Sequence, residues 1–363
     1  MSRPAWAEID LAALRHNLNI VRRAAPSSHI VAVIKANAYG HGIVRTAKAL
    51  SDTDAFGVAS IDEAVQLREA GISQRIVLLE GVFAPDELEL VVKYNLDLVV
   101  HNHAQVEMLE QGPASNSTIS IWLKLDTGMH RLGFSVDTLP GIVERLQNIS
   151  NTTIPVILMT HLANADDLQD KLTSIQLECF NAAVKKLGQQ QKLETSIANS
   201  AGILAWPASH TDWVRPGIML YGISPIHGKT AKDFDLQTVM SVKSKLIDIQ
   251  SLKKGDAVGY GGTWVCPEDM RVGVVAFGYG DGYPRHAKNG TPLLINNKRA
   301  FLIGRVSMDM ITVDLRDHDD AKAGDEVELW GKSLAVEEVA RSADTIAYEL
   351  VCGITQRVKY IEI

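Results

Sequence analysis

The sequence reads Val31-Ala-Val-Ile-Lys-Ala-Asn-Ala-Tyr-Gly40 where a short apolar run ends in a single lysine. Consecutive apolar residues over this length are typical of a parallel strand that is buried on both faces. A lysine at the end of such a strand can lose its solvent, which lowers its pKa and makes it a candidate Schiff-base nucleophile. The simpler interpretation is a lysine whose stem covers apolar surface. The rest of the chain decides between the two.

Apolar runs of this kind recur through the first two-thirds of the chain. We expect eight strands, at Ile30–Ile34, Ala55–Ala59, Ile76–Leu79, Leu96–Val100, Ile119–Leu125, Val156–Met159, Thr195–Ala198 and Ile218–Leu220. Helical spacing separates most of them, at Ile61–Ala70, Pro85–Tyr94, Ala104–Gln111, Thr138–Leu146 and Leu172–Leu187. Strands that alternate with helices indicate βα units and a parallel sheet, and eight such units predict a (β/α)8 barrel of the TIM type.

The pattern changes after about residue 235, where β-branched runs are separated by Gly and Asp turns. We expect strands at Val239–Ile249, Asp256–Tyr260, Val272–Phe277, Pro292–Ile295, Ala300–Ile303, Ile311–Asp314 and Glu326–Trp330, and one clear helix at Val336–Ser342. The predicted fold class is therefore α/β, with a barrel over residues 1–235 and a mostly-β C-terminal domain over residues 236–363.

Composition narrows the class of function. The net charge of -7 argues against nucleic acid or an anionic membrane as the main partner. The three cysteines have no CxxC spacing, which argues against a disulfide framework or a cysteine metal site and favours a reducing compartment. We find no apolar run long enough to span a membrane and no secretory signal in the first residues, so we expect a cytoplasmic protein without a bound metal.

Polar residues stand at several of the expected strand ends. Lys35 ends the first run, Lys124-Leu-Asp-Thr-Gly-Met-His-Arg131 ends the fifth, Thr160-His161 the sixth and Asn199-Ser200 the seventh, while Arg215-Pro-Gly217-Ile218 leads into the eighth. Active sites of barrels lie at the C-terminal ends of the strands. Each residue alone has a structural explanation, such as a helix cap for Ser200 or a satisfied core histidine for His161. Together they indicate a site.

Two features of this set suggest the cofactor. A hydroxyl and backbone N–H groups at a helix start, at Asn199-Ser200 with Gly217-Ile218, suit an anion, and barrels often bind phosphate near their last two strands. A Schiff-base lysine beside a phosphate site suggests pyridoxal 5'-phosphate (PLP).

With these residues, the chain resembles the alanine racemase family. The resemblance rests on several motifs, which follow the family order across essentially the whole chain: Lys35-Ala-Asn-Ala-Tyr39-Gly40-His41-Gly42, Lys124 to Gly133, Asn199-Ser200, Arg215-Pro-Gly217, Gly259-Tyr260-Gly261, Gly278-Tyr-Gly-Asp-Gly-Tyr-Pro284 and Ser307-Met308-Asp309. No single motif is decisive, but the set is specific. The family is a homodimer with active sites shared between subunits, and it interconverts L-alanine and D-alanine, either to supply D-alanine for peptidoglycan or to degrade it.

The resemblance implies catalytic roles for Lys35, which holds PLP, and for Tyr260 of the partner subunit. Removal of a proton from one face of Cα and its return to the other is better served by two opposed groups than by one. A tyrosine is a poor base unless nearby cations or hydrogen bonds lower its pKa, and we expect His161 and Arg215 to lie near it. Arg131 and the backbone of Met308 match substrate carboxylate contacts, and Lys124 matches a lysine that is carbamylated in many members.

The remaining implied roles concern the cofactor. By resemblance, PLP is bound by Lys35, Tyr39, Arg131, His161, Asn199, Ser200, Arg215, Gly217, Ile218 and Tyr348. Arg215 matches the arginine that faces the pyridine nitrogen. Because an arginine does not readily give up a proton, that nitrogen stays largely unprotonated, and we expect transamination to be suppressed. Entrance roles are implied for Asp166, Tyr279, Tyr283, Arg285 and Asp309, whereas His41 and Gly42 are interpreted as turn and helix entry.

Four alternatives remain open from the sequence. They are a racemase of serine or of broad specificity, a barrel decarboxylase, a PLP carrier without enzymatic activity, and a hydrolase that uses no PLP. Arg215 argues against the decarboxylase, which pairs the pyridine nitrogen with an acidic residue. The β domain, with Tyr260 and Met308, argues against a carrier. A hydrolase would need paired carboxylates or a metal set, and the cation-rich strand ends fit an anionic cofactor better.

Overall fold

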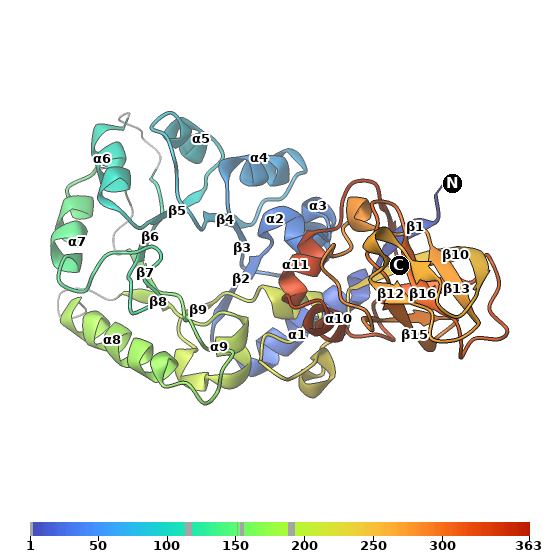
Figure 1. Ribbon diagram of the computed structural model, residues 1–363. Coiled ribbons are helices and arrows are strands. Elements are labelled where there is room, and N and C mark those ends of the chain that lie inside the picture. Colours follow the sequence, from blue (N-terminus) through green and yellow to red (C-terminus); the bar gives the residue numbers. More distant parts are fainter. Residues whose placement is uncertain (1–2, 113–117, 151, 153–155, 188–192) are drawn as a thin grey trace.

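The computed structural model describes residues 3–112, 118–150, 152, 156–187 and 193–363 of the chain. Figure 1 shows two lobes, a ring of strands surrounded by helices and a smaller lobe built mainly from strands.

The larger lobe is a closed barrel of eight parallel strands, so the predicted TIM-type barrel is confirmed. The strands are β2 (His29–Val33), β3 (Ala55–Val58), β4 (Arg75–Leu78), β5 (Asp97–Val100), β6 (Ile121–Lys124), β7 (Ile157–Met159), β8 (Glu194–Ser196) and β9 (Trp213–Val214). Most of their residues are buried, as expected for strands covered on both faces.

The expected eighth strand was wrong. Residues Ile218–Tyr221 form the 3-10 helix η2, and the strand that closes the barrel between β8 and β2 is β9, only two residues long. Because the whole run Ile218–Tyr221 is buried, its apolar pattern does not distinguish a strand from a helix. Arg215 therefore follows the eighth strand instead of leading into it.

The barrel helices bury one apolar face each. In α4, Ser60 caps the first turn by accepting a hydrogen bond from the Glu63 amide, and Ile61, Ala64 and Leu67 recur every three residues on the buried side. The helices are α1 (Leu11–Ala24), α2 (Lys35–Tyr39), α3 (Ile43–Ala49), α4 (Ile61–Glu69), α5 (Glu87–Lys93), α6 (His103–Gln111), α7 (Leu139–Gln147), α8 (Leu172–Leu187) and α9 (Ser200–Ala205), with the 3-10 turns η1 (Pro207–Ser209) and η3 (Ala231–Phe234).

A side-chain layer fills the barrel interior. Trp122 and Trp213 meet edge to face with ring centroids 5.3 Å apart, and the Trp122 indole donates to Asp97, which also pairs with Arg75. Val31, Ala55, Val77, Val99, Ile157 and Met159 complete this layer. The barrel is therefore packed inside, and open space remains at the ends of the strands.

The smaller lobe contains an eight-stranded sheet, which confirms the mostly-β C-terminal domain. Its strands, in spatial order, are β13 (Met270–Val275), β16 (Ile311–Asp314), β15 (Lys298–Ile303), β14 (Pro292–Ile295), β17 (Glu326–Trp330), β10 (Met240–Leu252), β1 (Ala5–Ile9) and β18 (Lys359–Glu362). β10 also pairs with β13, which closes the sheet. The lobe adds the pair β11 (Ala257–Val258) and β12 (Trp264–Val265), helices α10 (Val336–Ser342) and α11 (Ala347–Cys352), and the turns η4 (Tyr260–Gly262) and η5 (Tyr279–Asp281).

The N-terminal strand lies in this sheet and not in the barrel. β1 is antiparallel to β10 and parallel to β18, so it lies between two strands that come much later in the chain. Figure 1 shows β1 in the smaller lobe, near β10. α1 then leads from the sheet to the barrel. The division at residues 235 and 236 stays a prediction of the sequence.

Candidate functional site

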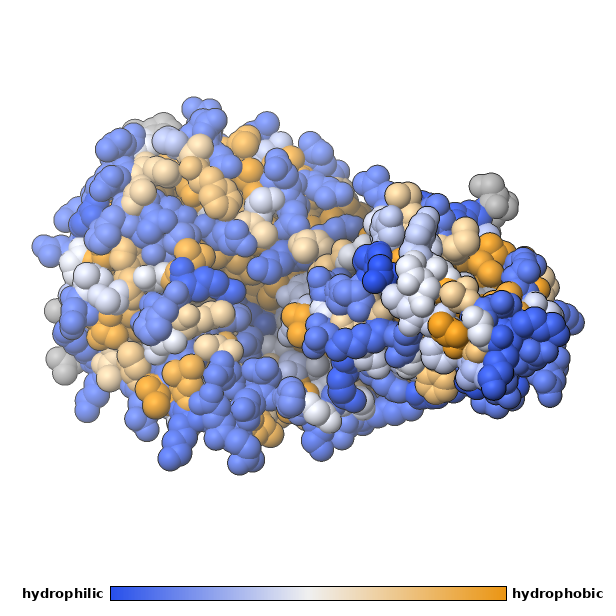
Figure 2. Space-filling view, in the orientation of Figure 1, coloured by the Kyte–Doolittle hydropathy of each residue, from blue (hydrophilic) through white to orange (hydrophobic). Residues whose placement is uncertain are grey.

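The C-terminal ends of the barrel strands surround one cavity of about 860 Å³. Figure 2 shows the barrel hollowed near its centre on the side that faces the viewer. Eleven of the thirteen residues predicted for the site line this cavity: Lys35, Tyr39, Lys124, Arg131, His161, Asn199, Ser200, Arg215, Gly217, Ile218 and Tyr348. Residues up to 313 positions apart in the sequence thus meet at one place.

Lys35 lies two residues beyond the end of β2 and opens α2, which is an unusual left-handed turn and not a regular helix. The residues of this turn, Ala36, Asn37, Ala38 and Tyr39, have φ angles of 53°, 53°, 54° and 51°. The left-handed region costs a residue other than glycine about 1–2 kcal/mol, so four in succession need support from their surroundings. Asn37 supplies part of it, because its side chain accepts a hydrogen bond from the Ile43 amide at 2.9 Å.

Gly40 allows this turn to pack against the β domain. It has φ of 79°, and a Cβ at this position would lie 2.1 Å from the backbone oxygen of Val351 in α11. Only glycine fits here, for both reasons. The Lys35 turn and α11 are therefore in direct backbone contact.

Ser200, Gly217 and Tyr39 form a pocket suited to an anion. The Ser200 hydroxyl accepts hydrogen bonds from the amides of Gly217 at 2.9 Å and Met219 at 3.3 Å, so its own proton is free to be donated. A Cβ on Gly217 would lie 2.6 Å from the Tyr39 hydroxyl, so the absence of a side chain keeps the space beside that hydroxyl open. Asn199 caps α9 by accepting from the Gly202 amide.

Arg215 is a buried donor held by protein acceptors. Its guanidinium donates to the Ser196 hydroxyl at 2.5 Å and to the backbone oxygens of Thr160 at 2.6 Å and Ile197 at 3.1 Å. Burial lowers its pKa to about 10, so it remains charged at neutral pH.

His161 lies beside this cation. Its Nδ1 is 3.5 Å from the Arg215 Nη2, which can only donate, so Nδ1 accepts. Burial, followed by the charges of Arg215 and Lys124, holds the pKa of His161 well below its usual value. The imidazole is therefore neutral at neutral pH.

Lys124 ends β6 and is only 8% exposed. Burial lowers its pKa to about 8, and the charges of Arg215, Arg131 and Lys35 act in the same direction. A substantial fraction of this amine is therefore neutral near pH 8, as a reaction with an electrophile requires.

One acidic residue in the cavity was missed. The Glu80 carboxylate, just beyond β4, lies 3.8 Å from the Lys35 Nζ and partly balances the charge of the cations. Its signal was available in the sequence, because Glu80 directly follows the expected strand Ile76–Leu79. The α11 residues Cys352 and Tyr348 also line the cavity, and α11 itself was not expected.

Two predicted site residues lie outside the cavity. Tyr260, in η4, is 69% exposed, and Met308 is 53% exposed on the β domain. Among the residues with implied entrance roles, Asp166 lines the cavity, whereas Tyr283 is 1% exposed and stacks on Trp330 as a core residue.

Two kinds of feature are absent from the described residues. None of the helices in these ranges is long and apolar enough to cross a membrane. The same ranges contain no group of three or more His, Cys, Asp or Glu residues placed to hold a metal ion.

Comparison with known proteins gives consistent matches over the whole chain. Residues 9–225 match the family model described as alanine racemase, N-terminal domain, and residues 239–362 match alanine racemase, C-terminal domain. The chain is 50% identical to an alanine racemase of Aeromonas hydrophila, with 98% of each protein covered. It is 49% identical to an enzyme of Escherichia coli named alanine racemase, biosynthetic, again with 98% of each covered. The crystal structure of biosynthetic alanine racemase from Pseudomonas aeruginosa superimposes with a TM-score of 0.95 at 44% identity, and 99% of each chain is covered.

Proposed function

The chain belongs to the alanine racemase family, and we infer that it interconverts L-alanine and D-alanine. The observation that carries this inference is the single cavity in which a strand-end lysine, an anion pocket and a buried arginine meet. The relatives from E. coli and P. aeruginosa are described as biosynthetic, which favours the supply of D-alanine over its breakdown.

PLP is the cofactor we assign to this cavity. The space beside Gly217, which a Cβ would fill, fits a phosphate that accepts hydrogen bonds from the hydroxyls of Tyr39 and Ser200. Lys35 would hold the cofactor covalently, with Ile218, Tyr348, Asn199 and His161 around it. When bound, PLP withdraws electron density from the substrate Cα and so acidifies its proton.

The chain's own residues then handle that proton. Lys35 Nζ acts on one face of Cα, and the Tyr260 hydroxyl from a second copy of the chain acts on the other. Arg131 and the Met308 backbone of the second copy orient the substrate carboxylate. Arg215, whose pKa of about 10 leaves it charged at neutral pH, would donate a hydrogen bond to the ring nitrogen and so would disfavour protonation of that nitrogen.

The second copy is part of the proposal because Tyr260 and Met308 of the β domain do not line the chain's own cavity. Tyr260 and Met308 are exposed, and so are the neighbouring Tyr279 and Met310, at 39% and 41%. Exposed apolar side chains grouped on one face are typical of an interaction surface. We assign this surface to a homodimer, in which each β domain completes the site of the other barrel.

Two further assignments follow from individual residues. The three cysteines, Cys179, Cys266 and Cys352, are free, which suits a cytoplasmic protein. Lys124 is a candidate for carbamylation, in which its neutral amine adds CO2 and releases one proton. Carbon-13 NMR with labelled bicarbonate tests this: we expect a carbamate signal that is absent from Lys124→Ala.

The activity itself is tested on the purified protein. We expect a visible absorption band from PLP bound to Lys35 that is lost on borohydride reduction, after which the cofactor stays attached to the denatured chain. We also expect conversion of L-alanine to the racemic mixture, followed by circular dichroism. Serine and other amino acids serve as comparison substrates. A PLP band with racemisation of serine but not alanine would reassign the substrate, and a band without any racemisation would favour a carrier.

A further inference from the structure

His41, in the Lys35 segment, is fully buried and makes two hydrogen bonds to the left-handed turn. Its Nδ1 lies 3.0 Å from the backbone oxygen of Ala38 and 2.8 Å from that of Tyr39. Both partners are carbonyl oxygens, so Nδ1 carries the proton and donates. The carbonyl of the next residue, Gly40, accepts from the Tyr360 hydroxyl of β18 at 2.8 Å. The turn is thus held by donors at three successive carbonyls.

The tautomer of His41 is fixed by its surroundings. Its Nε2 is buried and has no hydrogen-bond partner among the described residues. A proton there would be left unpaired, whereas a lone pair is tolerated better. Burial accordingly lowers the pKa of His41 to about 4, and the ring is neutral at neutral pH.

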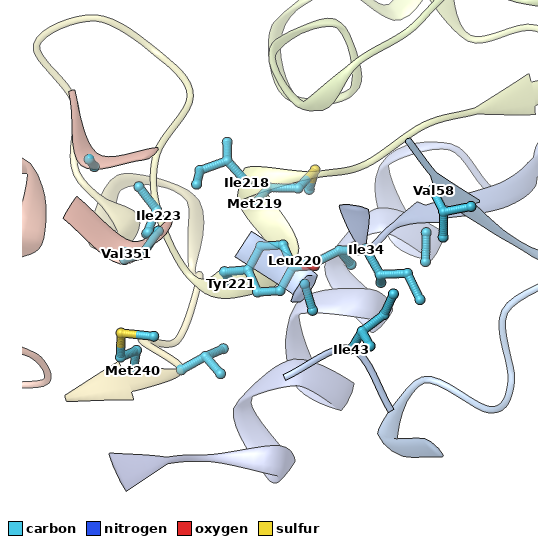
Figure 3. Close-up of a cluster of buried hydrophobic side chains, with 14 of the residues drawn as sticks. Ile34, Ile43, Val58, Ile218, Met219, Leu220, Tyr221, Ile223, Met240 and Val351 are labelled. Atoms are coloured by element: carbon cyan, nitrogen blue, oxygen red, sulfur yellow. The ribbon is translucent and has the colours of Figure 1, made fainter. Parts of the chain in front are cut away.

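The His41 ring also belongs to a series of tilted ring contacts that leads to the anion pocket. It lies 4.5 Å from the ring of Tyr221, which lies 4.8 Å from the ring of Tyr39, which in turn lies 6.0 Å from that of Tyr348. The Tyr221 hydroxyl donates to the Val33 oxygen at 3.0 Å, so this central ring is anchored to β2. Figure 3 shows Tyr221 in the buried cluster that also contains Ile34 and Ile43.

We propose that His41 is a positioning residue for phosphate binding. Its Nδ1 proton fixes the left-handed turn, and its ring, through Tyr221, fixes the Tyr39 ring so that the hydroxyl faces the space beside Gly217. This inference rests on the proposed function, since the phosphate is that of PLP. His41 itself does not touch the cofactor pocket, because it is not among the residues that line the cavity.

Two variants separate the hydrogen bond from the bulk of the side chain. His41→Asn keeps a donor on the atom bonded to Cγ, where Nδ1 stands, whereas His41→Gln moves its amide outward to the place of Nε2. We expect His41→Gln to weaken PLP binding about tenfold, the effect of one lost buried hydrogen bond, and His41→Asn to stay within about threefold of the wild type. Dissociation constants are measured from the visible absorbance of reconstituted protein.

Pyridoxal, which lacks the phosphate, distinguishes positioning from general damage to the fold. We expect His41→Gln to bind pyridoxal as the wild type does, because its defect concerns the phosphate alone. Equal losses for PLP and pyridoxal, or unchanged PLP binding, would overturn the inference. If His41→Gln does not fold, Tyr221→Leu removes the central ring of the series instead, and it must show the same selective loss for PLP. Failure of the wild type to bind PLP would overturn the proposed function itself.

Discussion

The site residues proposed for the barrel differ in their surroundings from Tyr260 and Met308, which are proposed for the β domain. In the barrel, Arg215 and Ser200 are each 4% exposed and are held by buried hydrogen bonds. In the β domain, Tyr260 and Met308 are exposed on turns. The barrel half is therefore preorganised within one chain, where rigid neighbours fix each donor. Tyr260 and Met308 are exposed, and we expect them to become buried only when a second copy of the chain covers them.

The first way to break this comparison is to remove Lys35, the proposed nucleophile of the barrel. Lys35→Ala should lose racemase activity by more than about 10⁴-fold, because it removes both the covalent attachment and one acid/base group. Circular dichroism of L-alanine over time measures the loss. The mutant should not retain PLP on denaturation after borohydride treatment. Substantial activity in this variant would place the attachment elsewhere.

The second prediction concerns the exposed hydroxyl of Tyr260. Tyr260→Phe should lower turnover by about 10²–10⁴-fold while PLP still binds, because only the acid/base hydroxyl is lost. Mixed with Lys35→Ala under conditions that exchange subunits, it should regain about a quarter of the wild-type activity. Half of the dimers are then mixed, and each has one complete site of two. If mixing restored nothing although subunits exchange, Tyr260 would have to act within its own chain.

The third prediction concerns the close backbone contact between Gly40 and α11. Gly40→Ala should lower the free energy of unfolding by about 3–4 kcal/mol, because its Cβ would collide with the Val351 oxygen and its φ is positive. Gly71→Ala is the matched control: φ is 82° there, with no atom within 4 Å of the added Cβ. It should lower the free energy by only about 1 kcal/mol. Urea unfolding of both variants measures the difference, and equal losses would show that the contact with α11 contributes nothing.

The fourth, with the smallest expected effect, concerns the buried cations of the barrel. The pKa of Lys124 is about 8 in the folded protein and near 10.5 when unfolded, so the unfolded chain binds more protons between these values. Unfolding free energy should therefore rise with pH in this window, by about 2–3 kcal/mol for this group. Urea unfolding of wild type and Lys124→Met at pH 7.5 and pH 10, in bicarbonate-free buffer, measures it. A rise of the same size in both proteins would exclude Lys124 as its source.

The barrel half was predictable because its signals are local. Buried parallel strands appear as apolar runs, and the polar residues that follow them, such as Lys35, Lys124 and His161, lie at the same end of the barrel. Where an apolar run was buried on all sides, as at Ile218–Tyr221, the pattern was ambiguous and the prediction failed. The 235/236 boundary was inferred from the change in the sequence pattern, whereas the roles of Tyr260 and Met308 rest on family resemblance. All three stay predictions.

Other features depend on partners distant in the sequence. Nothing in the segment Ala36–Tyr39 indicates four left-handed residues, because alanine and tyrosine rarely adopt this conformation alone. The conformation is supported by His41 and by Tyr360, more than 300 residues away. Likewise β1 showed no sign of its place in the sheet, since both of its pairing strands come much later in the chain.

The position of β1 has a consequence for synthesis on the ribosome. β1 emerges first, yet β10 and β18 become available only after residues 240–252 and 359–362 have been made. During translation the barrel can close from sequential βα units. Until β10 and β18 have been made, β1 has unpaired N–H and C=O groups on both edges. Such an edge invites association between nascent chains. We therefore expect a chain stopped at Val358, which lacks β18, to leave one edge of β1 open and to aggregate more readily than the chain that includes β18.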